Sequence, residues 1–361
     1  MSLQILPAAE VLAQLDAFDT VIDARSEGEF ALDHLPGAEN WPTLNDEERQ
    51  LIGTLYVQVN QFEAKKRGAV IAARNIAGHI EREVITKPKD WRPLAYCWRG
   101  GKRSGSLSLV LDQIGFRVTL VEGGYKAFRA AMLADIVEKV SLLNFQVVCG
   151  TTGSGKTRLL QALAAAGAQV LDLEALASHR SSVLGAIPGQ TQPTQKRFDT
   201  LVWDALRNFE PQRPVFVESE SKKVGNVSVP AALVERMRAS SCWDLTLTMD
   251  ERVALLLEDY DFFVKDSMHF CNRLDVLADF RGKAVVQAWK DQVTNGDFAP
   301  VVQELLVQHY DPVYLQSMQR NFVQYPQATA ITPGDRSVGS MGELAQRMLQ
   351  DMGATQPLVQ P

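Results

Sequence analysis

The chain has 361 residues, of which 46% are hydrophobic and 22% are charged, a composition typical of a globular protein large enough for two domains. Its formal net charge of −6 excludes a surface that is basic throughout, so a nucleic-acid partner would need a local basic patch. No apolar run is long enough to span a bilayer, and the widely spaced cysteines argue against a zinc site and against a disulfide framework. We therefore expect a cytoplasmic protein with free thiols and no membrane partner.

In the first half of the chain, short apolar strands alternate with helical stretches. Residues 20–23, 94–96 and 118–121 have the length and the apolar content of buried strands. Residues 104–114 and 127–140 show the spacing of apolar residues that is typical of helices. Alternation of this kind predicts a parallel sheet covered by helices.

A second α/β pattern begins with the apolar strand at residues 145–149. This strand runs into a glycine-rich loop, and a helix is expected from about residue 156 to residue 166. From Glu251 onward the pattern is mostly helical. Further strands are expected at residues 170–173, 215–217 and 245–247.

We therefore expect three consecutive segments of an α/β protein. Residues 1–135 form a domain with a parallel sheet, and residues 136–250 form an α/β domain that contains the glycine-rich loop. Residues 251–361 form a mostly helical C-terminal extension of that second domain.

A cysteine lies where the strand at residues 94–96 ends and the next helix begins. Glycines after it allow the backbone to curl so that its N–H groups point inward, and the helix adds the positive end of its dipole. Together with three nearby cations, these groups favour the thiolate of Cys97, which is the nucleophilic form of cysteine. The loop to which we assign this chemistry consists of Cys97, Trp98, Arg99, Gly100, Gly101, Lys102 and Arg103.

The spacing within this thiol loop keeps a second interpretation open. Five residues separate Cys97 from Arg103, and the same spacing occurs in cysteine-dependent phosphatases. In such an enzyme Cys97 would be the nucleophile and Arg103 would clamp the phosphate. A phosphatase leaves the second half of the chain without a role, so we rank it second.

The segment after the strand at residues 145–149 matches the pattern G-x-x-x-x-G-K-T in full, between a strand and a helix as the pattern requires. Its glycines permit close approach to phosphate, Lys156 reaches the terminal phosphates, and Thr157 is the ligand position if magnesium is used. Any diphosphate ester fits such a loop, so a nucleotide is not implied. The predicted diphosphate site consists of Gly150, Thr151, Thr152, Gly153, Ser154, Gly155, Lys156 and Thr157.

Glu218 follows the strand at residues 215–217, where many phosphate-loop enzymes carry an acidic ligand for magnesium. A metal ligand, a base and a carboxylate that caps the strand end are all compatible with this position. We therefore assign no metal ligand with certainty and keep Glu218 as a supporting residue.

Two motifs flank the thiol loop. One comprises Val21-Ile22-Asp23-Ala24-Arg25, Glu29-Phe30 and His34-Leu35-Pro36-Gly37-Ala38, and the other is Glu122-Gly123-Gly124-Tyr125. With the thiol loop between them, they resemble the rhodanese family. The resemblance implies that residues 1–135 are a rhodanese-like domain and that Cys97 carries a transferable sulfur or selenium atom.

Four segments extend the resemblance over most of the chain: Tyr96 to Gly101, Gly150 to Thr157, Gln192 to Phe198, and Val217 to Ser221. In this order they resemble bacterial tRNA 2-selenouridine synthases, in which a rhodanese domain precedes a phosphate-loop domain. The resemblance implies a transferase that converts 2-thiouridine at the tRNA wobble position to 2-selenouridine. A geranyl group from geranyl diphosphate is first attached to the ring sulfur, and selenium from selenophosphate then replaces the geranylated sulfur.

This order of steps is chemically reasonable, because an alkylated sulfur departs readily as a thiol whereas a thiocarbonyl sulfur does not. The diphosphate suits the loop that contains Lys156, and selenophosphate suits the cationic loop of Cys97. Lys196 and Arg197, which precede a helical stretch, are candidates for contacts to the diphosphate or to tRNA phosphates. Trp98 is a candidate for stacking on the uridine or the geranyl chain, or for packing against its own loop.

The implied partner is the tRNA anticodon stem-loop, which an acidic protein can bind only through a basic region. We expect a basic groove between the two domains, built from Lys65, Lys66, Arg67, Arg74, Arg99 and Arg103. A selenophosphate-producing enzyme is a further candidate partner. A competing hypothesis is a nucleotide-switched binding protein whose rhodanese half is catalytically inert.

Overall fold

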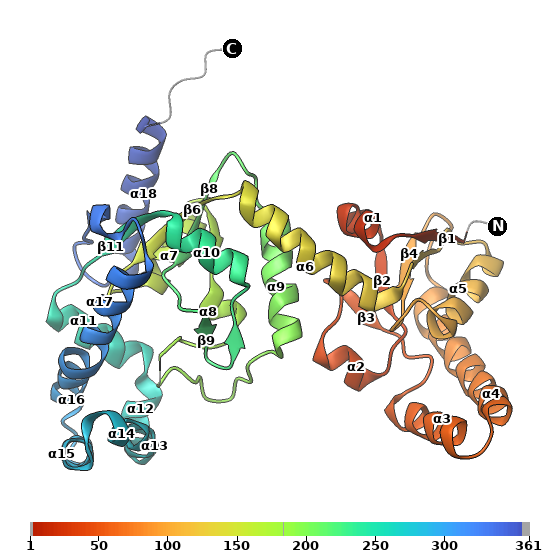
Figure 1. Cartoon of the computed structure of the whole chain (residues 1–361), viewed down its shortest axis with the longest axis horizontal. Helices are drawn as coiled ribbons and strands as arrows, with labels where there is room; N and C mark the ends of the chain where they lie inside the picture. The colour runs from red at the N-terminus through yellow and green to blue at the C-terminus, as the bar shows by residue number, and fades with distance from the viewer. Residues whose placement is uncertain (1–2, 183, 356–361) are drawn as a thin grey trace. The chain divides into compact units, whose positions relative to one another are not determined.

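The computed structural model describes residues 3–182 and 184–355, and its contacts divide the chain into two compact units (Figure 1). A short segment from the second half of the sequence belongs to the first unit, which the alternation of elements did not predict. The first unit comprises residues 1–138 and 193–204, and the second unit comprises residues 139–192 and 205–361.

The first unit is built on a sheet of five parallel strands in the order β1-β5-β4-β2-β3. Strand β4 is buried along its whole length and pairs with β2 and β5, as its apolar Leu94 and Ala95 favour. Because all strands run in one direction, their carboxyl ends meet at one edge, where Cys97 follows β4. The strands are β1 (Gln4–Leu6), β2 (Thr20–Asp23), β3 (Ala38–Asn40), β4 (Pro93–Tyr96) and β5 (Thr119–Val121).

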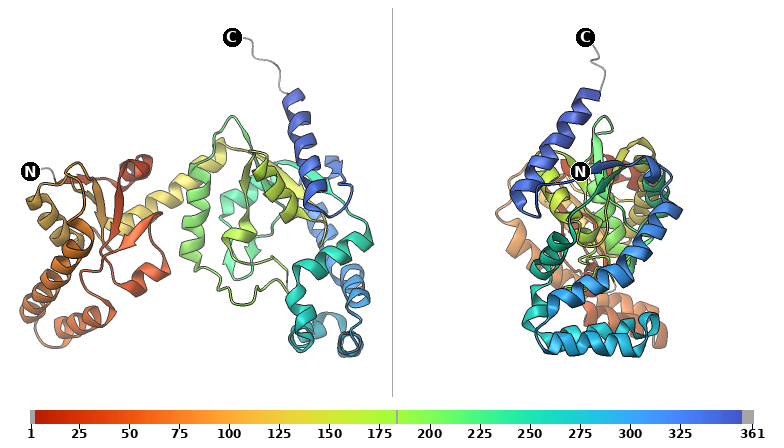
Figure 2. Two further views of the ribbon diagram at one scale, coloured as in Figure 1. Left: turned by 180° about the vertical axis from the view of Figure 1, so that it is seen from behind. Right: turned by 90° about the vertical axis from the view of Figure 1, so that its left-hand side faces the viewer.

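Helices of the first unit pack on this sheet through a shared core. Leu107 and Leu111 of α5 and Ile76 of α4 pack with the strand residues Ile22 and Ala95. Helices α3 and α4, which follow β3 in the sequence, lie side by side (Figures 1 and 2). The helices are α1 (Ala8–Ala13), η1 (Leu15–Ala17), α2 (Glu27–Leu32), α3 (Asp46–Gln58), α4 (Gln61–His79), η2 (Ile80–Val84), α5 (Lys102–Ile114) and α6 (Gly124–Leu142).

The second unit contains another sheet of five parallel strands, in the order β12-β11-β6-β8-β7, and a separate hairpin of β9 and β10. Its central strand β6 leads directly into the phosphate loop, which therefore lies at the carboxyl edge of the sheet. The strand expected at residues 245–247 is displaced toward the N-terminus, because polar Ser241 and Asp244 hid the paired strand from the apolar pattern. The strands are β6 (Asn144–Cys149), β7 (Gln169–Leu171), β8 (Pro214–Glu218), β9 (Lys223–Val224), β10 (Val227–Ser228), β11 (Ser241–Leu245) and β12 (Thr329–Ile331).

The expected helical part after residue 250 is present, but it also contributes the edge strand β12 to the sheet. Helix α18 packs along α7, where Met341, Leu344 and Met348 share a core with Leu159 and Leu163 (Figure 2). The helices of the second half are α7 (Lys156–Ala165), α8 (Leu173–Leu176), α9 (Gln195–Arg207), α10 (Ala231–Ala239), α11 (Met249–Asp259), α12 (Asp261–Lys265), α13 (Ser267–Leu274), η3 (Asp275–Leu277), α14 (Ala278–Arg281), α15 (Lys283–Thr294), α16 (Phe298–Leu305), η4 (Leu306–Tyr310), α17 (Asp311–Asn321), η5 (Tyr325–Gln327) and α18 (Val338–Thr355).

The first turns of α9 complete the first unit. Thr200 Oγ1 donates a hydrogen bond to Asp33 Oδ2 at 3.0 Å, and both residues are buried. The rings of Phe128 and Trp203 meet edge to face, with their centroids 5.6 Å apart. Because Phe128 lies on α6 and Asp33 follows α2, this segment contacts two separate parts of the first unit.

Candidate functional site

The thiol loop connects β4 to α5 and places a backbone N–H group at the sulfur of Cys97. Cys97 is buried, and its Sγ accepts a hydrogen bond from the Gly101 N–H at 3.2 Å. Gly100 has φ +63°, and a Cβ atom there would lie 2.8 Å from Val121 O, so only glycine fits this turn. The predicted inward N–H group is therefore present at the sulfur.

The cations of the thiol loop are placed in different ways. Arg99 and Lys102 are exposed. Arg103 is half-buried and forms a forked pair with Glu29 of α2, with Nη1 2.6 Å from Oε2 and Nη2 3.3 Å from Oε1. Burial works against the charge of Glu29, but the hydrogen bond and the charge of Arg103 outweigh it and hold the pKa of Glu29 below its ordinary value.

Lys196 and Arg197, expected at the diphosphate or at tRNA phosphates, belong to the first unit. Lys196 Nζ lies 5.7 Å from the ring centroid of Trp98, and Arg197 Nη1 donates to His34 O at 3.1 Å. Trp98 also stacks on Tyr125, with ring centroids 5.5 Å apart. The segment at the start of α9 therefore places a cation beside the residue that follows Cys97.

A buried polar network, which the sequence analysis missed, anchors the strand end before Cys97. Tyr96 Oη donates to Asp23 Oδ2 at 2.7 Å and accepts from Leu35 N at 3.1 Å. Asp23 also pairs with Arg25, whose Nη2 is 2.6 Å from Oδ2. The signal was present in the Asp-Ala-Arg of the opening motif, where two opposite charges follow a buried strand.

In the second unit, the phosphate loop has the backbone that its glycines predicted. Gly153 and Gly155 have φ +77° and +90°, conformations that other residues rarely adopt. Lys156 Nζ donates to Gly150 O at 2.7 Å and lies 5.3 Å from the ring centroid of Tyr314. The ammonium group is thus held against the carbonyl groups of the loop.

Helices α11 and α17 hold this loop from the C-terminal part of the chain. The guanidinium of Arg252 donates to Thr152 O at 2.8 and 3.0 Å and pairs with Asp311 at 2.6 Å. The Gly150 N–H donates to Tyr314 Oη at 2.7 Å. These partners lie 100 or more residues away in the sequence, and no local pattern marked them.

Carboxylates gather beside Lys156 and Thr157. Glu218 is 2% exposed, and its Oε1 accepts from Glu174 N at 2.8 Å, while Thr157 Oγ1 donates to Glu174 Oε2 at 3.3 Å. Burial, followed by the charge of Glu220, raises the pKa of Glu174 to about 8, against the opposing effect of Lys156. Burial also raises the pKa of Glu218 well above its ordinary value.

These oxygen atoms are of the kind that magnesium prefers. Within residues 3–182 and 184–355, however, no three histidine, cysteine or acidic side chains are arranged to hold a metal ion. Magnesium at Thr157 therefore stays a prediction.

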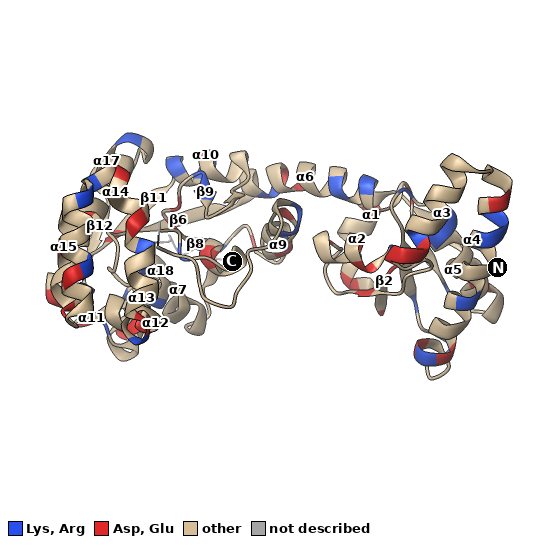
Figure 3. Ribbon diagram, turned by 90° about the horizontal axis from the view of Figure 1, so that it is seen from below, with Lys and Arg blue, Asp and Glu red and all other residues tan. Residues whose placement is uncertain are grey.

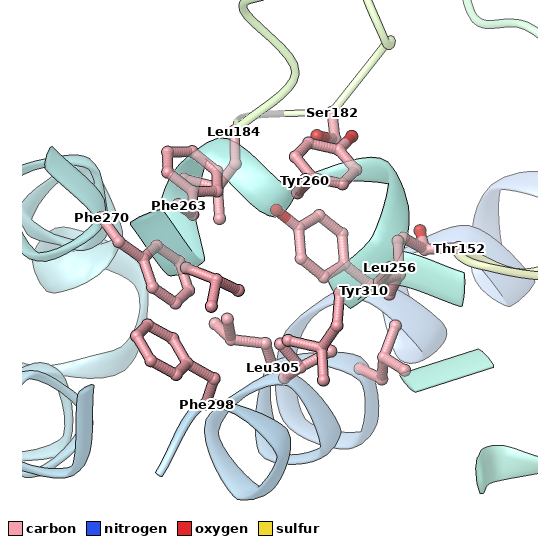
Figure 4. A pocket seen from close by; sticks show the side chains of 14 residues that line it. Thr152, Ser182, Leu184, Leu256, Tyr260, Phe263, Phe270, Phe298, Leu305 and Tyr310 are labelled. Carbon is pink, nitrogen blue, oxygen red and sulfur yellow. The ribbon is translucent and has the colours of Figure 1, made fainter. Parts of the chain in front are cut away.

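An apolar cavity of about 60 Å³ begins at Thr152 of the phosphate loop (Figure 4). Aromatic rings from α12, α13 and α16 surround it, and Ser182 lies at its rim. Sequence patterns did not predict this cavity, because its wall joins residues 256–310 to Thr152, Ser182 and Leu184, which lie far earlier in the sequence. The lining residues include Leu184, Leu256, Tyr260, Phe263, Phe270, Phe298, Leu305 and Tyr310.

The basic residues predicted for RNA lie on α4. Figure 3 shows Lys and Arg positions in blue on this helix. Lys65, Lys66, Arg67 and Arg74 are all exposed. Lys66 Nζ pairs with Glu63 at 2.5 Å, so part of its charge is matched within the helix. The aromatic ring of Phe62 on the same helix is also exposed.

Two family models match the chain: the rhodanese-like domain over residues 7–131 and the tRNA 2-selenouridine synthase AAA domain over residues 143–282. A tRNA 2-selenouridine synthase of Cupriavidus pinatubonensis is 30% identical over 356 residues, which cover 88% of this chain and 92% of that protein. The chain belongs to the tRNA 2-selenouridine synthase family. The predicted family and the predicted order of a rhodanese-like domain before a phosphate-loop domain are thereby confirmed.

Other members of the family match a smaller part of their length. The synthase of Nitrosomonas eutropha is 35% identical over 70% of this chain and 65% of its own length, and that of Nitrosomonas europaea is 36% identical over 66% of this chain and 63% of its own length. The chain thus spans a little under two thirds of the length of these relatives.

Among solved structures, a rhodanese-like domain protein from Staphylococcus aureus is 18% identical over 35% of this chain and 90% of that chain, with a TM-score of 0.23. No helix in the described part of the chain combines the length and the apolar character needed to cross a membrane.

Proposed function

We propose that this chain converts wobble 2-thiouridine of tRNA to 2-selenouridine through an S-geranyl-2-thiouridine intermediate. The observation that carries the proposal is the apolar cavity that begins at Thr152 of the phosphate loop, within one unit. A prenyl diphosphate has a polyanionic part that matches the phosphate loop and a hydrocarbon chain that matches the apolar cavity. Membership of the family supports tRNA and selenium as the remaining reactants.

The cavity suits a prenyl chain better than a nucleoside. Its wall is made largely of aromatic and aliphatic side chains, including Phe263, Phe270 and Phe298 (Figure 4). A nucleobase buried there would leave most of its donors and acceptors without partners. Because the cavity measures about 60 Å³, a geranyl chain would have to move these side chains apart on entry.

In the first step, the ring sulfur attacks the first carbon of geranyl diphosphate, the carbon–oxygen bond breaks and diphosphate leaves. Lys156, held 2.7 Å from Gly150 O, can neutralise the charge that develops on this leaving group. In the second step, selenium from selenophosphate replaces the geranylated sulfur, and Cys97 is the nucleophile that handles the donor.

The test is mass spectrometry of the wobble nucleoside after tRNA is incubated with the protein, geranyl diphosphate and selenophosphate. We expect Cys97→Ser to stop at the S-geranyl nucleoside, and Lys156→Ala to slow geranylation about 100-fold, as loss of a charge-stabilising donor does. The Lys156→Ala protein supplied with S-geranyl tRNA should still incorporate selenium. Selenium incorporation by Cys97→Ser at the wild-type rate would contradict the assignment of Cys97.

The nucleotide-switched binding protein remains the alternative for the second unit. Competition between geranyl diphosphate and other phosphate ligands for the phosphate loop distinguishes the two functions. We expect geranyl diphosphate to displace a labelled diphosphate from the wild-type protein. Tight binding of ATP or GTP that geranyl diphosphate does not displace would favour the switch.

A further inference from the structure

The selenium donor constrains what Cys97 can do. Selenium in selenophosphate is already at the oxidation level of selenide. A sulfur–selenium bond at Cys97 would therefore require an oxidant or the reduction of phosphorus, and the proposed reaction supplies neither. Attack of the Cys97 thiolate on phosphorus requires no electron acceptor, because the electron pair of the phosphorus–selenium bond leaves with selenium.

The backbone of the thiol loop is suited to a tetrahedral oxyanion next to the sulfur. Cys97 Sγ is 3.2 Å from Gly101 N, and α5 begins at the next residue, Lys102. The first N–H groups of a helix lack intrahelical partners and favour phosphate oxygens. Helix α5 has 13 residues, and its N-terminus follows the loop that holds the nucleophile.

Arg103 has the sequence spacing of a phosphate clamp. It follows Cys97 after five residues, and its guanidinium is oriented by Glu29 through contacts of 2.6 and 3.3 Å. Glu29 also contacts Arg49 at 3.3 Å, so this carboxylate is surrounded by positive charge and stays ionised. It therefore orients Arg103 and does not serve as a proton donor.

The composition of the loop also bears on the leaving group. Residues 97–104 include no carboxylic acid. Cleavage of a phosphate ester with an oxygen leaving group is assisted by an acid that protonates that oxygen. Selenide is a stable anion and needs no such acid, so the loop fits a phosphorus–selenium bond better than an oxygen ester.

We propose that Cys97 attacks the phosphorus of selenophosphate while Arg103 clamps the phosphoryl oxygens, so that the thiol loop is a phosphoryl acceptor that releases selenide. This inference rests on the proposed function, in which selenophosphate is the donor. A sulfur–phosphorus bond forms and the phosphorus–selenium bond breaks. The released selenide takes a proton from water, and the resulting hydrogen selenide ion displaces the geranylthiolate from the ring carbon and gives it that proton. Water cleaves the phosphocysteine, which returns the Cys97 thiol and phosphate.

The experiment uses the full chain and selenophosphate that carries radioactive phosphorus in one arm and radioactive selenium in the other. The reaction is stopped in alkaline denaturant, in which phosphocysteine survives, and the peptides are mapped. We expect phosphorus but no selenium on the Cys97 peptide, and no label on Cys97→Ser. Selenium on Cys97 without phosphorus, or neither label, would overturn the proposal.

The labelling requires no RNA, so its outcome is independent of whether the wobble base is converted. A protein that forms phosphocysteine but never makes 2-selenouridine would refute the proposed function alone. In the clamp test, Arg103→Lys should slow phosphorus labelling about 100-fold, because a lysine lacks the additional N–H groups that a guanidinium paired with Glu29 keeps for phosphoryl oxygens. The matched control is Arg117→Lys, at an exposed arginine of the same unit. Equal labelling rates in the two variants would remove Arg103 from the mechanism.

Discussion

In our proposals one residue of each loop carries the chemistry, and the environments of these two residues differ in kind. The sulfur of Cys97 is met by a backbone N–H group, whereas Lys156 is held by the carbonyl of Gly150 and the ring of Tyr314. Each arrangement depends on glycines that allow the backbone to turn tightly. A substitution at Gly100 would place a Cβ atom 2.8 Å from Val121 O, so the loop tolerates no side chain there.

Glu218 illustrates the cost of a buried carboxylate. Burial, and then the charges of Asp172, Glu220 and Glu174, raise its pKa well above the ordinary value. A raised pKa means that the folded protein binds this proton more tightly than the unfolded chain does. Its stabilising contribution is therefore complete below about pH 4.3, the pKa of an unperturbed glutamate, and is lost as the pH rises through the folded-state pKa.

We therefore expect Glu218→Gln to be more stable than the wild type at pH 8, by about 1–3 kcal/mol, and to differ less at pH 5. The amide keeps an acceptor for the Glu174 N–H and has no charge to bury. Urea denaturation at the two pH values measures the effect. The control is Glu235→Gln on α10, where the side chain is exposed. If the stability of Glu218→Gln depended on pH as steeply as that of the wild type, Glu218 would not contribute to the pH dependence of stability.

At the scale of elements, α9 is the helix whose position the sequence pattern did not predict. Its first turns pack on the first unit, where Arg129 Nη2 contacts Asp199 Oδ2 at 2.5 Å and Thr200 donates to Asp33. Asp33 also accepts from Tyr125 Oη at 2.7 Å. Burial raises the pKa of Asp33, and these hydroxyl groups and Arg129 oppose that rise. The attachment of α9 thus depends on hydrogen bonds that compensate for the burial of the Asp33 carboxylate.

Thr200→Val should weaken this attachment, because valine fills the same volume without a hydroxyl group. We expect a loss of about 1–3 kcal/mol in the free energy of unfolding, the range for a hydrogen bond to a buried charged group. Denaturant unfolding followed by tryptophan fluorescence is a suitable measurement. Thr54→Val on the exposed face of α3 is the matched control. Identical unfolding curves for the two variants would exclude a stabilising role for the Thr200–Asp33 bond.

At the scale of the whole molecule, the substrate that we propose is a polyanion, whereas the protein is acidic. The net charge is −6, yet α4 presents Lys65, Lys66, Arg67 and Arg74 on exposed positions. Local charge of this kind dominates RNA affinity, because each contact between a cation and a phosphate releases counterions. The affinity therefore falls as the salt concentration of the solution rises. Helix α4 is therefore our candidate for the tRNA contact.

Charge reversal tests this assignment residue by residue. Arg67→Glu and Lys65→Glu should each weaken tRNA binding and reduce the slope of log affinity against log salt by about 0.9 for each lost phosphate contact. Lys66→Glu should have a smaller effect, because Glu63 already matches that charge. Lys89→Glu, an exposed lysine of the same unit, is the control. Equal slopes in all four variants would place the RNA elsewhere.

Local features of the molecule could be predicted from sequence to a large extent. The strand before Cys97, the strand before Gly150 and the helices after both loops follow from apolar periodicity and glycine placement, which act over a few residues. The short strands β1 and β3 escaped prediction, because three residues carry too little periodicity to be recognised.

By itself, the sequence determined the two loops, the fold class and the family, because each of these depends on contiguous residues. Only the tertiary structure decided which distant side chains meet. It paired Arg103 with Glu29, placed Lys196 beside Trp98, joined Arg252 to Thr152 and assembled the apolar cavity at the phosphate loop. The physical reason is that these contacts link elements separated by long stretches of chain, and their geometry arises from packing, which no local pattern encodes.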